Sequence, residues 1–204
     1  MKKTLFTLVL LLAVWSVSFA QAQFALGIKA GPNFANLNFD ESPGVNYKAR
    51  TGFHGGAFAL VKLTKFGIQP EVLFSQQGSK VTFNSQELES NFTYVNIPVM
   101  LKFYLVGGLN LQAGPQIGFV TSAKQDFFDD VTQTLIKGED IKDQLNGVDF
   151  SAALGAGWDL PFGLTIDARY NLGLSNITKD NSSEEAKNQV FQLSLGFKLI
   201  KLGK

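Results

Sequence analysis

The chain has 204 residues, which is enough for one domain of ordinary size. Charged residues make up only 17% of it, against roughly 25% in soluble domains, and 18 Lys+Arg balance 17 Asp+Glu, which excludes a basic surface for nucleic acid. Cysteine is absent, so disulfides, thiol chemistry and an N-terminal lipoprotein anchor are excluded as well.

The first 22 residues have the pattern of a secretory signal peptide. Lys2 and Lys3 precede an apolar run over residues 5–19, and small residues follow at Ala20 and Ala22. The run is shorter than the roughly 20 residues that a membrane-spanning helix needs. We therefore predict a signal peptide over residues 1–22, cleaved after Ala20 or Ala22, and a mature domain over residues 23–204.

Eight segments of the mature chain alternate apolar and polar residues with the period of a β-strand. They are residues 24–34, 53–63, 66–77, 94–104, 109–120, 149–160, 164–174 and 189–199. In the stretch IQPEVLFSQQG, Ile68 and Phe74 lie on one face and Gln69 and Glu71 on the other, and only Leu73 departs from the pattern. Each segment has about the 9–11 residues that a tilted strand needs to cross a bilayer.

The connections between these segments alternate strictly between short and long. Residues 64–65, 106–108 and 161–163 are tight turns, whereas residues 36–52, 78–92, 121–148 and 175–188 are long and polar. All long loops then lie at one end, as in outer-membrane barrels, which have an even number of strands. We predict an all-β fold: an eight-stranded antiparallel up-and-down transmembrane β-barrel.

The same alternation would suit a soluble barrel with its apolar face inside, so the orientation of the two faces must be argued. The apolar set has on the order of forty bulky side chains, too many for the interior of an eight-stranded barrel. The other face carries Gly, Ser, Asn and Gln rather than the Lys/Glu mixture of a solvated surface. We therefore expect the apolar face to contact lipid and the polar face to line the lumen.

Three prolines and two groups of aromatic residues add detail to this prediction. Pro70, Pro98 and Pro115 lie inside strands, where each removes a ladder donor, so we expect β-bulges there. An aromatic girdle is expected at each membrane boundary. The residues are Phe66, Phe103, Trp158 and Phe162 near the tight turns, and Phe34, Phe53, Phe74, Phe119 and Phe150 near the long loops.

The predicted lumen contains few charges, and five of them form our candidate site: Lys29, Glu71, Lys102, Asp167 and Arg169. Counting from the tight turns places Glu71 and Lys102 at similar depth, so we expect an ion pair between them. Asp167 and Arg169 should lie opposite Ala156 and Leu154. Unpaired buried charges are costly, which favours a structural polar network that plugs the lumen over a narrow ion path.

His54 is the only histidine, so a lipid-modifying Ser-His-Glu enzyme would have to use it. The predicted strand pairing places His54 opposite Gln76 and out of hydrogen-bond reach of Glu71, so we interpret it as a polar residue near a loop. The acidic stretch 125–145 matches no EF-hand spacing and is interpreted as a solvated loop. We expect no enzyme activity, no metal and no cofactor.

Six motifs give the chain a family resemblance. In order they are LGIKAGPNFANL, IQPEVLFSQQG, YVNIPVMLKFY, LQAGPQIGF, LGAGWDL and IDARYNLGLSNI, and they span essentially the whole mature chain. Together they resemble the PorT-like outer-membrane β-barrel domains of Bacteroidota. The resemblance implies lumen positions for Lys29, Glu71, Lys102 and Arg169 and supplies no catalytic residues.

The expected function follows from this fold. We expect a monomeric barrel in the outer membrane of a Gram-negative bacterium, in contact with outer-membrane lipid. Its role would be structural or interaction-based, through the long external loops. Alternatives are an accessory role in protein secretion, with envelope or secretion proteins as partners, and a narrow pore.

Overall fold

The computed structural model describes residues 22–39, 47–83, 86–129, 134–179 and 186–203. The predicted signal peptide therefore lies outside the described residues, apart from Ala22, at which the first strand begins. None of the described helices is long and apolar enough to cross a membrane.

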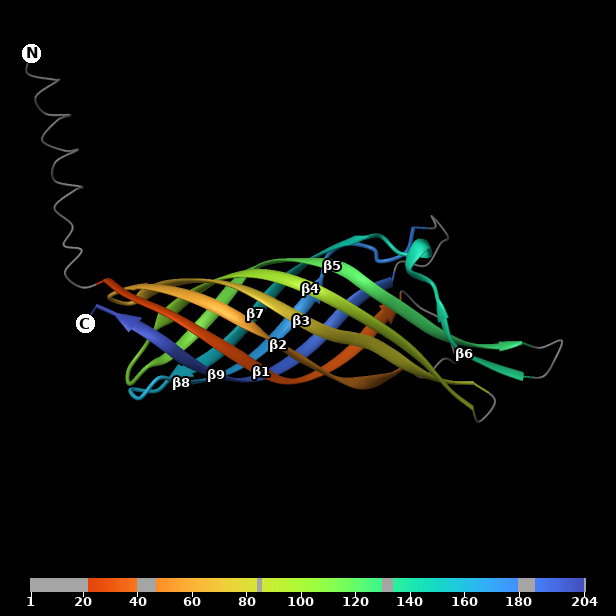
Figure 1. Ribbon diagram of the computed structural model, residues 1–204, viewed down its shortest axis with the longest axis horizontal. Helices are drawn as coiled ribbons and strands as arrows, with labels where there is room; N and C mark the ends of the chain where they lie inside the picture. The colour runs from red at the N-terminus through yellow and green to blue at the C-terminus, as the bar shows by residue number, and fades with distance from the viewer. Residues whose placement is uncertain (1–21, 40–46, 84–85, 130–133, 180–185, 204) are drawn as a thin grey trace, which may run out of the picture.

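Nine strands and one short helix make up the described part of the chain (Figure 1). The strands are β1 (Ala22–Phe39), β2 (Tyr47–Leu63), β3 (Phe66–Phe83), β4 (Gln86–Tyr104), β5 (Leu109–Asp129), β6 (Thr134–Asp140), β7 (Val148–Asp159), β8 (Leu164–Gly173) and β9 (Ala186–Leu202). The helix is a 3₁₀ turn, η2 (Lys142–Gln144).

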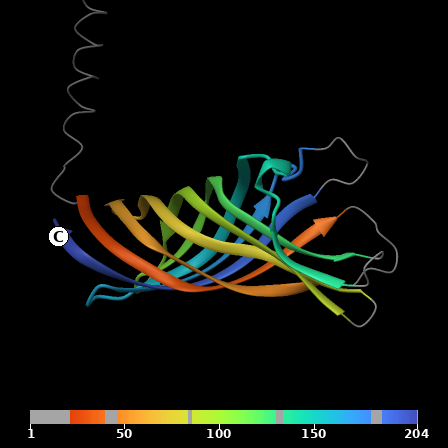
Figure 2. The same ribbon diagram turned by 45° about the vertical axis from the view of Figure 1, so that its right-hand side comes forward.

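Eight of the strands close into an antiparallel ring, which confirms the predicted barrel. Neighbours in the ring follow the order β4-β3-β2-β1-β9-β8-β7-β5, and β5 also pairs with β4 to complete the circle. Strands that follow one another along the chain pair antiparallel, except β6 and β7: β6 pairs with the outer part of β5, and β7 pairs with the rest of β5. The prediction did not include the ninth strand, β6. Figures 1 and 2 show the ring as a long, twisted cylinder with both ends of the described chain at the same end.

The two faces of the strands are sorted as predicted. Buried residues of β7, β8 and β9 are almost all on the inward face, and their large apolar residues point outward, as at Leu154 (60% exposed) and Leu195 (57%). The inside of the ring is mainly polar, but it also holds Leu73, Phe58 and Met100, each no more than 4% exposed. Gly27 makes room for the Phe58 ring, which a Cβ at that position would overlap.

Tight turns join the strands at one end, here called the tight-turn end. They lie at the predicted positions, and their backbones need positive φ: 52° at Thr64, 66° and 86° at Gly107 and Gly108, and 104° at Gly163. Glycine adopts such values without steric cost, and Thr64 is the only other described residue that does so.

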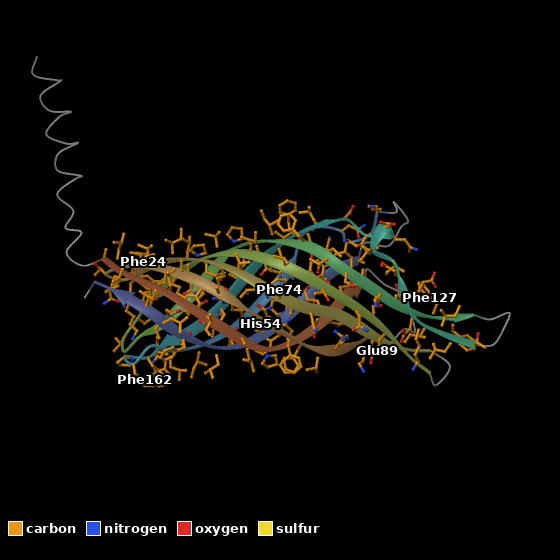
Figure 3. All side chains as sticks on the ribbon, viewed as in Figure 1. Phe24, His54, Phe74, Glu89, Phe127 and Phe162 are labelled. Carbon is orange, nitrogen blue, oxygen red and sulfur yellow. The ribbon has the colours of Figure 1, made fainter. Side chains whose placement is uncertain are left out.

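At the opposite end, here called the hairpin end, strands extend into the predicted long loops 36–52, 78–92 and 121–148, whereas in the loop 175–188 only residues 186–188 are strand. β3 continues to Phe83 and β4 starts at Gln86, so the predicted loop 78–92 is almost wholly paired. Phe74 lies near the middle of the molecule, whereas Phe162 marks the tight-turn end (Figure 3). The nine residues from Ser75 to Phe83 span about 30 Å at 3.3 Å per residue, so this hairpin extends well past the aromatic girdle.

The prediction of β-bulges at the prolines was wrong. The pairing register is the same on both sides of Pro70, Pro98 and Pro115. In an antiparallel ladder each residue directs its N–H to one neighbouring strand, so a proline loses one hydrogen bond without requiring an extra residue. The register shifts lie elsewhere, between Leu26 and Gly27, for example, where β1 pairs with β9.

A charge on the outward face tests the lipid contact. We expect Leu195→Arg, near the middle of β9, to lower the free energy of unfolding from phospholipid vesicles by about 2–4 kcal/mol, because a guanidinium at the bilayer midplane is costly. The control is Leu202→Arg at the tight-turn end, with an expected loss of about 0–1 kcal/mol. Equal losses in a denaturant titration would contradict the lipid-facing assignment.

Candidate functional site

The five charged residues predicted for the lumen lie together in the middle of the ring. They come from four strands, β1, β3, β4 and β8, and each is at most 3% exposed. All five side chains point inward because their positions share the polar face of the alternation.

Arg169 and Glu71 form the bridge that crosses the lumen. Arg169 Nη1 and Nη2 donate to Glu71 Oε2 and Oε1 at 2.9 and 2.7 Å, a bidentate pair. β8 and β3 stand four places apart in a ring of eight strands, so this pair joins opposite walls. Gln69 also donates to Glu71 (2.6 Å), and Arg169 Nε donates to Gln112 (2.9 Å).

Asp167 links the remaining members of the cluster. Its carboxylate accepts a 2.7 Å hydrogen bond from Lys29 Nζ and lies 3.7 Å from Lys102 Nζ. Lys29 is also 3.6 Å from Glu71, and Gln112 donates to Asp167. Each buried charge therefore has an opposite charge and at least one hydrogen bond, which buried ions require in order to remain ionised.

Asp159 extends the network towards the tight-turn end. Its carboxylate accepts hydrogen bonds from Lys198 (2.7 Å), Tyr104 (2.8 Å) and Lys102 (3.3 Å). Asp159 was not among the predicted site residues, and its partners lie on β4 and β9, far from β7 in sequence.

The predicted Glu71–Lys102 ion pair was wrong. Lys102 lies opposite Gly67, about four residues closer to the tight-turn end than Glu71, and it pairs with Asp159 and Asp167 instead. The prediction counted depth from two different turns. Strands of a closed barrel are staggered, so turns on neighbouring hairpins do not lie at one height.

The predicted cross-strand partners of Asp167 and Arg169 were shifted by one residue. They lie opposite Gly157 and Gly155, not Ala156 and Leu154. Residues directly opposite each other share a face of the sheet, so an inward residue must pair with an inward one. A Cβ at Gly157 would overlap Gln112 and Asp167, which shows that these glycines provide the space for the network.

His54 is part of the lumen, so its interpretation as a polar residue near a loop was wrong. His54 lies in β2, opposite Ser75 of β3, and its side chain is 4% exposed (Figure 3). Its Nδ1 lies 2.7 Å from Asn33 Oδ1 and its Nε2 lies 2.8 Å from Ser194 Oγ. Asn33 uses its amide nitrogen to donate to Ser75, so Oδ1 is the acceptor and Nδ1 carries a proton.

This Ser-His-Asn arrangement has the hydrogen-bond order of a nucleophile, a base and an orienting residue. Ser194, His54 and Asn33 are all buried, however, at no more than 5% exposure. The three residues form hydrogen bonds across β1, β2 and β9 inside the lumen. No group of three acidic or histidine side chains in the described ranges is placed to hold a metal.

A cluster of buried apolar residues, here called the apolar lid, lies at the hairpin end. Its members are Phe92, Tyr94, Val120, Ala123, Ile141, Leu145, Ile177 and Ala186. Backbone hydrogen bonds hold the segment around η2 in place: Ile141 N donates to Ala123 O (3.0 Å), and Asn146 N donates to Ile177 O (2.8 Å). The acidic stretch is therefore not simply a solvated loop, because Ile141 and Leu145 anchor it inside the barrel mouth.

These features define an outer-membrane β-barrel: a closed ring, an apolar outer face, and a polar lumen filled by paired charges. The chain belongs to the family described as Outer membrane protein beta-barrel domain, whose model matches residues 19–179. It is accordingly an outer-membrane protein of the Gram-negative type.

Two solved structures show the same fold at low sequence identity. Neisserial surface protein A is 8% identical, with a TM-score of 0.52, covering 85% of this chain and 97% of its own. Ail, the attachment invasion locus protein of Yersinia pestis, is 14% identical, with a TM-score of 0.50, covering 89% of this chain and 99% of its own. A comparison with curated proteins found no sequence match.

Removing one member of the bridge across the lumen tests the role of the network. We expect Arg169→Ala to lower the free energy of unfolding by about 3–5 kcal/mol, because it leaves the Glu71 carboxylate buried and uncompensated. The measurement is denaturant unfolding of the barrel in detergent or vesicles.

A more exposed ion pair provides the matched control. Arg50 lies 3.8 Å from Glu89 near the hairpin end, so Arg50→Ala should cost no more than about 1 kcal/mol. The double variant Arg169→Met, Glu71→Met should recover most of the loss, because it removes both charges. A loss in Arg169→Ala no larger than in Arg50→Ala would refute the structural role.

Proposed function

We propose that this protein is a closed outer-membrane barrel whose role is interaction through the strands that extend from its hairpin end. The observation that carries the proposal is the contrast between the two parts of the molecule. The lumen is crossed by the Glu71–Arg169 bridge and has the apolar lid at its hairpin end, whereas β3, β4, β5 and β6 extend past the aromatic girdle as a paired sheet.

Ion pairs and side-chain caps stiffen this extension. Glu89 of β4 pairs with Lys80 of β3 (2.5 Å) and with Arg50 of β2 (3.8 Å). Asp126 of β5 accepts hydrogen bonds from the backbone N–H of Gly138 in β6 (2.9 Å) and of Glu89 in β4 (3.3 Å). Five strands are thus held together, so the sheet presents a preorganised surface, which lowers the entropic cost of binding a partner.

The surface of β6 is open to contact. Six of its seven residues are exposed, and Ile136 presents an apolar side chain that is 43% exposed next to Lys137. Ile136 and Lys137 together offer an apolar and a charged contact to a partner. The expected partner is a macromolecule outside the cell.

The remaining parts of the proposal follow from the sequence. Short turns of bacterial barrels face the periplasm, so we place the tight-turn end and both termini there and the hairpin end outside. Residues 1–22 act as a cleaved signal peptide, and the mature chain is a monomer in contact with outer-membrane lipid. The six ordered motifs support the narrower PorT-like assignment, and with it an accessory role in secretion as the alternative function.

Cysteine labelling tests the orientation, because the chain has no cysteine of its own. In intact cells we expect a membrane-impermeant maleimide to label Ile136→Cys, and to label Lys65→Cys only after the outer membrane is permeabilised. The reverse pattern would place the hairpin end in the periplasm and refute the proposal.

Photo-crosslinking tests the interaction role. A photo-reactive amino acid at Ile136 should give discrete covalent adducts with a partner presented outside the cell, whereas the same amino acid at Lys65 should not give those adducts. If adducts form only from Lys65, and deletion of the gene strands secreted cargo in the periplasm, the secretion alternative replaces the proposal.

The ion pair across the lumen predicts the electrical behaviour of the barrel. In planar bilayers the purified protein should give no discrete conductance steps, because the bidentate Arg169–Glu71 ion pair crosses the narrow lumen. Regular steps in the unmodified protein that disappear or change size in Arg169→Ala would establish a pore instead.

A further inference from the structure

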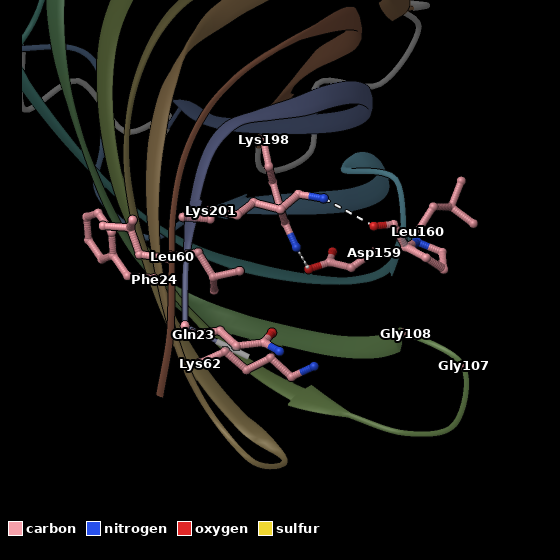
Figure 4. A pocket seen from close by; sticks show the side chains of 14 residues that line it. Gln23, Phe24, Leu60, Lys62, Gly107, Gly108, Asp159, Leu160, Lys198 and Lys201 are labelled. Atoms are coloured by element: carbon pink, nitrogen blue, oxygen red, sulfur yellow. Dashed lines mark hydrogen bonds and ion pairs between the residues drawn. The ribbon is translucent and has the colours of Figure 1, made fainter. Parts of the chain in front are cut away.

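A cavity of about 370 Å³ opens at the tight-turn end, at the opposite end from the proposed interaction surface (Figure 4). Its charged lining consists of Lys62 on β2, Lys198 and Lys201 on β9, and Asp159 at the end of β7. We call this cavity the lysine basin. Its volume is within the range of small-ligand sites, about 300–1,000 Å³.

A register shift brings both β9 lysines into the basin. Residues 198 and 201 are three apart, so in a regular strand their side chains would point to opposite faces. The register between β1 and β9 shifts at Leu26/Gly27, so that Gly27 lies opposite Lys198 while Ala25 lies opposite Lys201. Ala25 and Gly27 both face inward, and opposite residues share a face, so both lysines face inward too. Bulges of this kind re-aim side chains and are over-represented next to functional sites.

The basin has more positive charge than its own carboxylate can balance. Asp159 is already shared among Lys102, Lys198 and Tyr104. Lys62 Nζ lies 4.1 Å from the centroid of the Tyr104 ring, and Lys201 Nζ donates to the carbonyl oxygen of Pro161 at 3.1 Å. Neither Lys62 nor Lys201 pairs with a carboxylate among the described residues. Three ammonium groups against one carboxylate leave a charge of +2 around the cavity.

We propose that the lysine basin binds the phosphate group of a phosphorylated molecule. A phosphate monoester carries about −1.5 to −2 charges at neutral pH, which matches the excess of the basin. Lysine binds phosphate as a point charge, and the basin offers three such charges. Leu60 and Leu160 line the same cavity and can contact the carbon atoms next to the phosphate.

Calorimetric titration of the purified barrel in a maltoside detergent, which contains no phosphate, tests this proposal. The probes are inorganic phosphate and glycerol 3-phosphate. We expect binding at millimolar or lower concentration, weakened about tenfold by Lys62→Gln and by Lys201→Gln, because each removes one charge-assisted contact.

Lys65→Gln is the matched control. Lys65 is exposed in the adjacent tight turn, does not line the basin, and its replacement removes the same charge from the same end. Its affinity should change less than twofold. Each variant must keep the gel mobility of the folded, unheated barrel, so that loss of binding is not loss of fold. Absence of binding for both probes and in the lipid assay below, or equal weakening in all three variants, overturns the proposal.

A second comparison separates the two sources of such a phosphate group. The barrel is placed in phosphatidylcholine nanodiscs with and without phosphatidic acid, and glycerol 3-phosphate is titrated into each. If phosphatidic acid competes with glycerol 3-phosphate, and Lys62→Gln removes the competition, the ligand source is the lipid headgroup. If glycerol 3-phosphate binds equally well in both nanodiscs, the source is a soluble periplasmic phosphate. Both results support a phosphate site.

Discussion

Every peptide group that crosses a lipid bilayer must have a hydrogen-bond partner within the protein, because the hydrocarbon offers none. For strands this is possible only if the sheet closes on itself, since an open edge would leave a row of donors and acceptors without partners. The pairing of β4 with β5 is therefore the contact on which the structure depends. It joins the two edges of the sheet and so separates the lumen from the lipid. Because side chains alternate between the two faces of a strand, every second residue then points into the lumen and the others point to lipid.

Closure of only eight strands makes a narrow lumen, and its contents follow from that size. Polar side chains on the inward face cannot be solvated by bulk water, so they must satisfy one another. The charged cluster does this with amide groups as intermediates: Gln69 and Gln112 each donate to a carboxylate that also pairs with a cation. The Asn33 amide likewise joins two polar side chains, because it accepts a hydrogen bond from His54 and donates one to Ser75. The barrel is consequently held across its diameter as well as around its circumference.

The two ends of the lumen differ in chemistry, since one is apolar and the other is lined by lysines, and this difference suggests separate roles. At the hairpin end, Ile141 and Leu145 of the segment that leads from β6 to β7 are buried in one apolar cluster with Ile177. At the tight-turn end the lumen widens into the lysine basin, where charge is left uncompensated. An apolar lid at one end and a cationic basin at the other are consistent with the two binding roles proposed for this barrel.

The sequence by itself determined the number of barrel strands, their faces and the tight turns, because side-chain alternation and glycine-rich turns are local properties. It also identified the five central charges as inward, since the parity of Lys29, Glu71, Lys102, Asp167 and Arg169 follows from their strands. Only the tertiary structure decided which of these charges meet, because stagger and cross-strand register depend on closure of the whole ring. The same holds for the addition of β6, the apolar lid and the inward turn of Lys201. Each results from contacts between segments far apart in sequence, which no local pattern encodes.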